Sequence, residues 1–181
     1  GLNRYFGGVF RECTKGIVGV QFRNGATVGG SVFGRYGFSD ILTCMMMLDA
    51  QVELYRRGRI SLEEFAKLPY DRDILVQVIL KKDGRRAAYT SSRRSKTDFP
   101  MIACGVAKKG DSWYVSVGAR PAKAALCVLP DGKETVQELA EKAAEAFTYG
   151  DNMRAGGEYR KYLAQVSIRR LMEQISREEE K

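Results

Sequence analysis

The 181-residue chain contains no histidine, and none of its four cysteines forms a Cys-x-x-Cys pair. Histidine is the commonest general base and a common metal ligand, so its absence argues against Ser–His–Asp catalysis and a histidine metal centre. The cysteines are too widely spaced for a zinc or iron–sulfur ligand set, and we interpret them as buried free thiols in a reducing compartment. We therefore assign no catalytic and no metal-binding residue to the chain.

A long apolar run is also missing. The longest, Ile41–Leu48, is far shorter than the roughly 20 residues that a membrane-spanning helix needs. No signal peptide is visible in the sequence. We expect a cytoplasmic protein without a membrane partner.

Acidic residues are outnumbered, with 30 Lys and Arg against 22 Asp and Glu and a net charge of +8. Such an excess can indicate a nucleic-acid partner, a solvated basic surface or one face of an assembly. The basic blocks at residues 81–86 and 93–96 look like loops, and no aromatic-and-basic recognition motif accompanies them. We expect no nucleic-acid partner, and a nucleic-acid-binding domain is the weakest of the functions considered.

Periodic apolar residues and turn signals predict an α+β fold. Ser39 and Ser61 each precede an expected helix, and Lys108–Asp111 has the composition of a hairpin turn. Gly84 and the basic residues after it interrupt the periodicity, and we place a subdomain boundary there. Helices are expected over residues 2–15, 41–48, 61–65, 135–147 and 158–175, and strands over residues 50–55, 74–80, 87–92, 101–107, 113–119 and 124–129.

A glycine pair between two hydroxyl residues is the most informative feature of the sequence. It lies in residues 23–31, which read Arg-Asn-Gly-Ala-Thr-Val-Gly-Gly-Ser. Glycine has no Cβ, so the backbone can approach a ligand closely, and its N–H groups can bind phosphate oxygens. A glycine pair alone is a weak signal, because such pairs usually just make turns.

The surrounding residues make the pattern more specific. Arg23-Asn24 and the glycine pair are followed by Ser39-Asp40, about eight residues further on. This order resembles the second flavin-binding segment of the FAD-binding (medium) subunits of molybdopterin dehydrogenases, the xanthine dehydrogenase and carbon monoxide dehydrogenase family. The resemblance covers nearly the whole chain and continues in residues 48–54, 59–65, 73–75, 93–94, 98–100 and 158–163.

The resemblance implies two domains. Residues 1–88 would form the C-terminal part of a flavin-binding subdomain, and residues 89–181 a small antiparallel sheet packed with helices. Family members carry a further N-terminal βαβ segment with its own flavin loop, which this sequence lacks. The chain is then a fragment, or its other half lies in another polypeptide, and we expect an incomplete FAD site.

The family resemblance also implies which residues contact FAD. The loop around Thr27 would hold the pyrophosphate, and Asp40 would accept a hydrogen bond from a ribityl hydroxyl. Aliphatic residues at 74 and 75 and an aromatic residue at 89 would lie near the flavin ring. From the residues alone, a helix cap at Asp40 and a core strand at residues 74–75 remain alternatives. The expected FAD contacts are Ala26, Thr27, Gly29, Gly30, Ser31, Ser39, Asp40, Ile74, Leu75 and Tyr89.

As a member of this family, the chain would be an electron-transfer subunit, or part of one, of a xanthine dehydrogenase-type oxidoreductase. Electrons would pass from 2Fe–2S clusters through FAD to NAD or another acceptor. The clusters and the molybdenum cofactor would lie on an iron–sulfur subunit and a molybdopterin subunit of a hetero-oligomer. The alternative is a structural or docking module of such a complex that binds no flavin.

Overall fold

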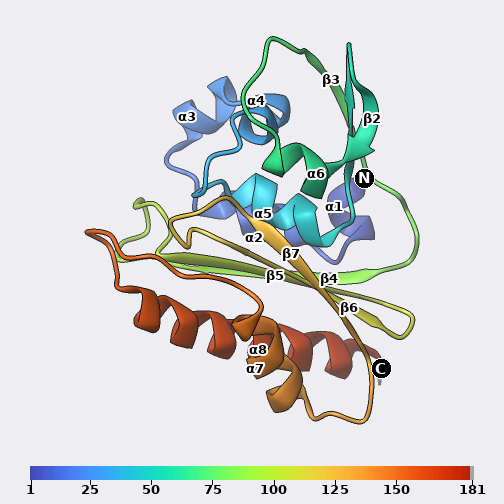
Figure 1. The fold of residues 1–181 in the computed structure, drawn as a ribbon, viewed down its shortest axis with the longest axis vertical. Coiled ribbons are helices and arrows are strands. Elements are labelled where there is room, and N and C mark those ends of the chain that lie inside the picture. Colours follow the sequence, from blue (N-terminus) through green and yellow to red (C-terminus); the bar gives the residue numbers. More distant parts are fainter. Residues whose placement is uncertain (180–181) are drawn as a thin grey trace.

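The structure, a computed structural model, describes residues 1–179. In these residues, helices and two antiparallel sheets form the expected α+β fold (Figure 1). A four-stranded sheet lies in the middle, with α7 (Val136–Glu145) and α8 (Gly157–Glu179) on one face. The N-terminal elements cover the other face. No helix in the described part of the chain has the length and apolar character needed to cross a bilayer.

The strands pair with their neighbours in an almost sequential order. The smaller sheet has the order β2-β1-β3, formed by Gly58–Ser61, Gln51–Leu54 and Leu75–Ile79. The larger sheet has the order β4-β5-β6-β7, formed by Arg86–Ser92, Ile102–Lys109, Ser112–Gly118 and Ala125–Pro130. The hairpin between β5 and β6 is confirmed, with Lys109 opposite Ser112 and a left-handed Gly110 in the turn. Sequence reasoning missed β2, which is short and begins at Gly58.

Side-chain caps fix where several helices begin. Ser39 accepts a hydrogen bond from the backbone N–H of Leu42 at 3.1 Å and caps α5 (Asp40–Met47). Ser61 accepts one from Glu64 at 3.0 Å and caps α6 (Leu62–Lys67), as predicted. The remaining helices are α1 (Leu2–Tyr5), α2 (Val9–Lys15), α3 (Val20–Gly25) and α4 (Val28–Phe33).

Three local expectations are wrong. The single helix over residues 2–15 is broken into α1 and α2, because Gly7 and Gly8 have φ angles of +62° and +87°. The glycine-containing stretch is mostly helical, in α3 and α4, where a loop was expected. The C-terminal helix was expected to end at residue 175, but α8 continues to Glu179, whose carboxylate accepts a hydrogen bond from Lys108 at 3.0 Å. Residues 180 and 181 lie outside the described part.

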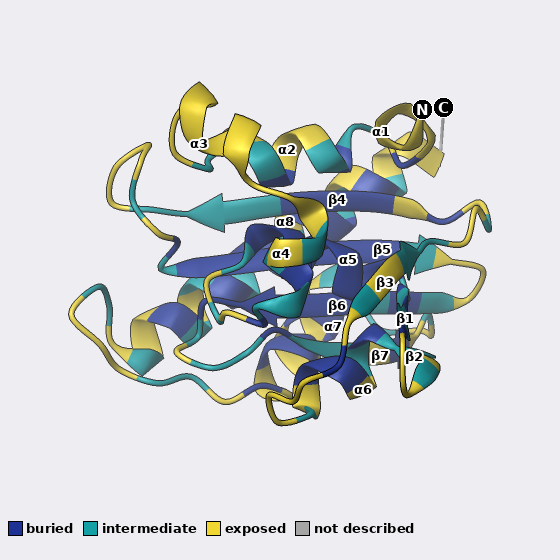
Figure 2. Cartoon of the chain, turned by 90° about the horizontal axis from the view of Figure 1, so that it is seen from above, coloured by how far each residue is buried: buried dark blue, intermediate teal, exposed yellow. Residues whose placement is uncertain are grey.

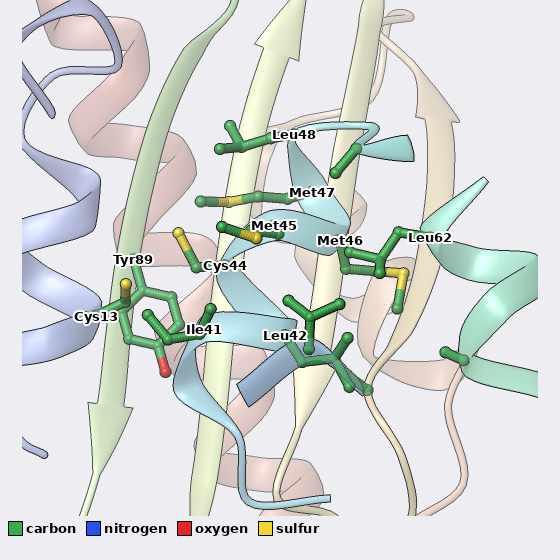
Figure 3. Packing of buried hydrophobic residues seen from close by; sticks show 14 of the residues in the cluster. Cys13, Ile41, Leu42, Cys44, Met45, Met46, Met47, Leu48, Leu62 and Tyr89 are labelled. Atoms are coloured by element: carbon green, nitrogen blue, oxygen red, sulfur yellow. The ribbon is translucent and has the colours of Figure 1, made fainter. Parts of the chain in front are cut away.

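Helix α5 is buried along its whole length, between the larger sheet and the N-terminal elements (Figures 2 and 3). Its run Met45-Met46-Met47 packs into the core, as the unbranched and adaptable methionine side chain allows. The cysteines are free thiols as expected; Cys13, Cys44 and Cys104 are buried and Cys127 is half-buried.

Strand β4 contributes to the cores on both faces of the larger sheet. Ala88 packs with α7 and α8, whereas the next residue, Tyr89, packs into the core that contains α5. This alternation is the normal consequence of the two-residue period of a strand. The division of the chain between residues 88 and 89 stays a prediction.

Gly105 on β5 lies directly against α5. A Cβ atom at this position would lie 2.6 Å from the Met47 Sδ and 2.8 Å from the Ser116 Oγ. We expect Gly105→Ala to lower the free energy of unfolding by about 1–3 kcal/mol, because the packed interior must shift. Urea denaturation measures this change. Gly29→Ala is the control, because nothing lies within 4 Å of that Cβ position; an equal loss in both variants would contradict the packing described here.

Candidate functional site

A cavity of about 670 Å³ lies beside the N-terminus of α5. Its wall comes from the α2–α3 and α3–α4 connections, from the segment before α5 and from the loop that follows β4. We call it the α4–α5 cavity. Segments up to about 80 residues apart in the chain therefore meet in one place, as is common for a ligand site.

Six of the ten predicted contact residues line this cavity, and four do not. Gly29 lies on α4 between the lining residues Thr27 and Gly30 but is not part of the wall. Tyr89 reaches the site only through its contact with Asp40. Ile74 and Leu75 lie at the start of β3 in the smaller sheet, and Ile74 is exposed. The lining residues are Ala26, Thr27, Gly30, Ser31, Ser39 and Asp40.

Thr27 organises the glycine-containing side of the cavity. Its Oγ1 accepts a hydrogen bond from the Gly30 backbone N–H at 3.0 Å and so caps α4. A helix leaves its first N–H groups without intrahelical acceptors, and this cap satisfies only one of them. The Thr27 hydroxyl still has its own hydrogen to donate. A side chain at position 30 would crowd this cap, because its Cβ would lie 3.0 Å from Thr27 Oγ1.

The two serines connect α4 to α5. The Ser31 hydroxyl donates to the Thr27 carbonyl at 3.0 Å, and the Ser39 hydroxyl donates to the Ser31 carbonyl at 3.1 Å. Both hydroxyl hydrogens are therefore used inside the protein. Toward a ligand in the cavity, these two oxygens can act only as acceptors.

Asp40 is the buried carboxylate of the site, only 5% exposed. Its Oδ1 accepts a hydrogen bond from the Tyr89 hydroxyl at 2.6 Å and forms an ion pair with Arg93 at 2.6 Å. Its Oδ2 has no hydrogen-bond partner among residues 1–179. A buried carboxylate needs such partners to remain charged, and the pair leaves one oxygen available at the cavity wall.

Arg93 holds the carboxylate from the end of β4. Besides Asp40, its guanidinium donates to the Asp98 carbonyl at 2.6 Å and to the Ser91 hydroxyl at 3.3 Å. It also packs against Gly16, where a Cβ would lie 2.8 Å from the Arg93 Nε. Sequence reasoning missed Arg93 as a site residue; the Arg93-Arg94 match to the family was the available signal.

Aromatic rings form the open side of the cavity. Phe22, Tyr36, Phe38 and Phe99 are exposed and all line it. Tyr36 and Phe38 are stacked, with centroids 5.3 Å apart and an interplanar angle of 6°, and Phe38 is 4.3 Å from Phe99. Sequence reasoning did not identify these rings, because they come from separate segments. Exposed rings around a cavity are typical of a surface that binds a planar ligand.

The surroundings of Asp40 keep nearby acids protonated. Burial, followed by the negative charge of Asp40, raises the pKa of Tyr89 well above its ordinary value. Burial is also the main cause of the raised pKa of Cys44 on α5. Tyr89 is therefore a hydrogen-bond donor to Asp40 over the whole neutral range.

Comparisons with known proteins give a family match for part of the chain. Residues 7–82 match the family described as the FAD binding domain in molybdopterin dehydrogenase. A relative from Escherichia coli K12, Uncharacterized protein YgfM, is 24% identical over 168 residues. This match covers 91% of the chain but 64% of YgfM, so the chain spans less than two thirds of that relative.

Solved structures share the fold. Carbon monoxide dehydrogenase from Hydrogenophaga pseudoflava gives a TM-score of 0.79 at 18% identity, covering 96% of this chain and 69% of that chain. Quinoline 2-oxidoreductase from Pseudomonas putida 86 gives 0.76 at 17% identity, covering 91% and 65%.

The hydrogen bond from Tyr89 to Asp40 gives a pH-dependent prediction. The folded state keeps the Tyr89 proton, whereas the unfolded state loses it above about pH 10. The stability from this group is therefore complete below pH 10 and falls as the pH rises further. We expect Tyr89→Phe to lower the free energy of unfolding by about 1.5–3 kcal/mol at neutral pH and to flatten its fall above pH 10.

Urea denaturation from pH 7 to pH 11 measures both effects. Tyr162→Phe, at an exposed position on α8, is the control. Identical pH profiles for Tyr89→Phe and the unsubstituted protein would contradict the buried hydrogen bond.

Proposed function

Because residues 7–82 belong to the FAD-binding domain family of molybdopterin dehydrogenases, we propose that this chain contributes an FAD site to an electron-transferring oxidoreductase. The α4–α5 cavity is the site. The observation that carries the proposal is that one cavity wall combines the capped N-terminus of α4 with the available oxygen of Asp40.

The donors at α4 suit the pyrophosphate of FAD. The Thr27 hydroxyl has a hydrogen to donate, and the first N–H groups of α4 point their positive end toward its N-terminus. Arg93 adds a positive charge to the cavity lining, although Asp40 balances it. Gly30 keeps the wall open, because a larger residue would press on the cap.

The acceptors suit the hydroxyl-rich ribityl chain. A ribityl hydroxyl can donate to the Asp40 Oδ2, and the oxygens of Ser31 and Ser39 are further acceptors. Tyr89 and Arg93 both bind Oδ1, so the orientation of the carboxylate is fixed before a ligand arrives. Such preorganisation reduces the entropy that binding must overcome.

The exposed rings suit the planar parts of FAD. Phe22, Tyr36, Phe38 and Phe99 offer apolar faces at the mouth of the cavity, against which an isoalloxazine or adenine ring can stack. When bound, FAD supplies the exchange of electrons with a donor and an acceptor. The part of this chain is to bind the cofactor, orient it and exclude water from it.

The proposed function also includes partner subunits for this chain. We place the chain in a hetero-oligomer with an iron–sulfur subunit and a molybdopterin subunit, which hold the 2Fe–2S clusters and the molybdenum cofactor. NAD or another acceptor receives the electrons. The support is the fold shared with carbon monoxide dehydrogenase and quinoline 2-oxidoreductase, together with the family of residues 7–82. Ile74, Leu75 and Gly29 stay as predicted FAD contacts, although they do not line the cavity.

We expect Asp40→Asn to weaken FAD binding by roughly 10- to 100-fold, because a hydrogen bond to a charged acceptor contributes about 1.5–3 kcal/mol. Titration of the protein into FAD, followed by flavin fluorescence, gives the affinity. Asp111→Asn, in the β5–β6 turn, is the control and should bind FAD like the unsubstituted protein.

Thr27→Val gives an independent measure of the contribution of the α4 N-terminus. It removes the hydroxyl but keeps the side-chain shape, and its effect on FAD binding should add to that of Asp40→Asn. Circular dichroism confirms that each variant is folded. No saturable binding of FAD to the unsubstituted chain, or full affinity in both variants, would contradict the proposed site and favour a docking module that binds no flavin.

A further inference from the structure

A second cavity, of about 420 Å³, adjoins the first. Its wall comes from the loops that follow β4, β6 and α7, which gather at one end of the larger sheet (Figure 1). Phe38 and Phe99 line both cavities and lie 4.3 Å apart between their centroids. We call this second space the loop cavity. Nothing in the proposed FAD site requires it.

Three basic side chains line the loop cavity: Lys123, Arg154 and Arg160. Among residues 1–179, only Arg154 has an acidic partner, Asp98, at 3.3 Å. The Lys123 ammonium donates to the Leu68 carbonyl at 3.3 Å and forms no ion pair with a carboxylate in the described part of the chain. The wall therefore carries more positive charge than its own carboxylates neutralise.

Arg160 is a buried residue that lines the loop cavity. It is only 1% exposed, and its guanidinium donates to the carbonyls of Met101, Ala119 and Ala155 and to the Asn152 side chain. These partners are neutral, so they fix its position without cancelling its charge. Burial and then the positive charge of Arg154 lower the pKa of Arg160, whereas the negative charge of Asp151 partly opposes them.

Apolar groups complete the wall. Phe38, Phe99, Pro100 and Pro121 line the cavity beside the three cations. Charge–charge attraction is stronger where water is excluded, and guanidinium groups match the geometry of carboxylates and phosphates. An anion between the cations would also relieve their mutual repulsion.

We propose that the loop cavity binds a compact oxoanion, a carboxylate or phosphate group, between Lys123, Arg154 and Arg160. The volume suits a small metabolite or one end of a larger one. The shared rings place this anion directly beside the α4–α5 cavity. The anion site does not depend on FAD, so its test is carried out without FAD.

Inorganic phosphate and malonate are the two probes. Each is titrated into the whole chain at constant ionic strength, with chloride as the balancing anion, while backbone NMR shifts and the unfolding temperature are recorded. We expect saturable shifts in the loops around residues 98–100, 119–123 and 152–154 and a rise in Tm with at least one probe. Saturation by phosphate alone assigns a phosphate ligand, and saturation by malonate alone assigns a carboxylate.

Charge-removing variants test the assignment of the cations. Lys123→Gln and Arg154→Gln should each weaken anion binding by roughly tenfold or more, because each removes a charge-assisted contact. Lys123→Gln breaks no ion pair, so it stays interpretable even if Arg154→Gln disturbs the Asp98 loop. Lys161→Gln, an exposed change on α8, is the matched control. Arg160 is left intact, because it holds three backbone carbonyls.

Two results would overturn the proposal. One is the absence of saturable shifts with both phosphate and malonate. The other is an affinity in Lys123→Gln and Arg154→Gln equal to that of Lys161→Gln, which would mean that the anion binds elsewhere.

Discussion

The ion pair of Asp40 with Arg93, completed by the Tyr89 hydroxyl, is the interaction on which the site depends. It joins the N-terminus of α5 to the end of β4 and, through Arg93, to the loop at Asp98. A buried carboxylate is costly unless it is paired, so these contacts fix one geometry of the three segments. The α4–α5 cavity lies where they meet, and its shape follows from that geometry.

Helix α5 connects the ion pair at Asp40 to the core of the protein. Its residues are all buried, and it packs on β5 and β6 with Gly105 giving room for Met47. The position of its first residue, Asp40, is therefore set by a core and not by a mobile loop. This arrangement explains how short helices and loops around the cavity can present a preorganised acceptor to a ligand.

Sequence reasoning predicted the parts of the molecule that depend on local patterns. Residue type and spacing predicted the caps at Ser39 and Ser61 and the β5–β6 hairpin. Helices α3 and α4 were missed, because the glycines in this stretch disfavour helices. Arg93 and the rings at the cavity mouth were missed because only the fold brings them to Asp40. The ligand contacts of Gly29, Ile74 and Leu75 rested on the family alone, and these residues do not line the cavity.

The most direct test of the account is a backbone NMR titration of the chain with FAD. If FAD binds in the α4–α5 cavity, its addition causes saturable shifts in residues 26–31, 39–41 and 98–99. At the same FAD concentration, these residues shift less in the Asp40→Asn variant. Shifts confined to other surfaces, or none up to saturating FAD, would contradict the assignment of this cavity to the cofactor.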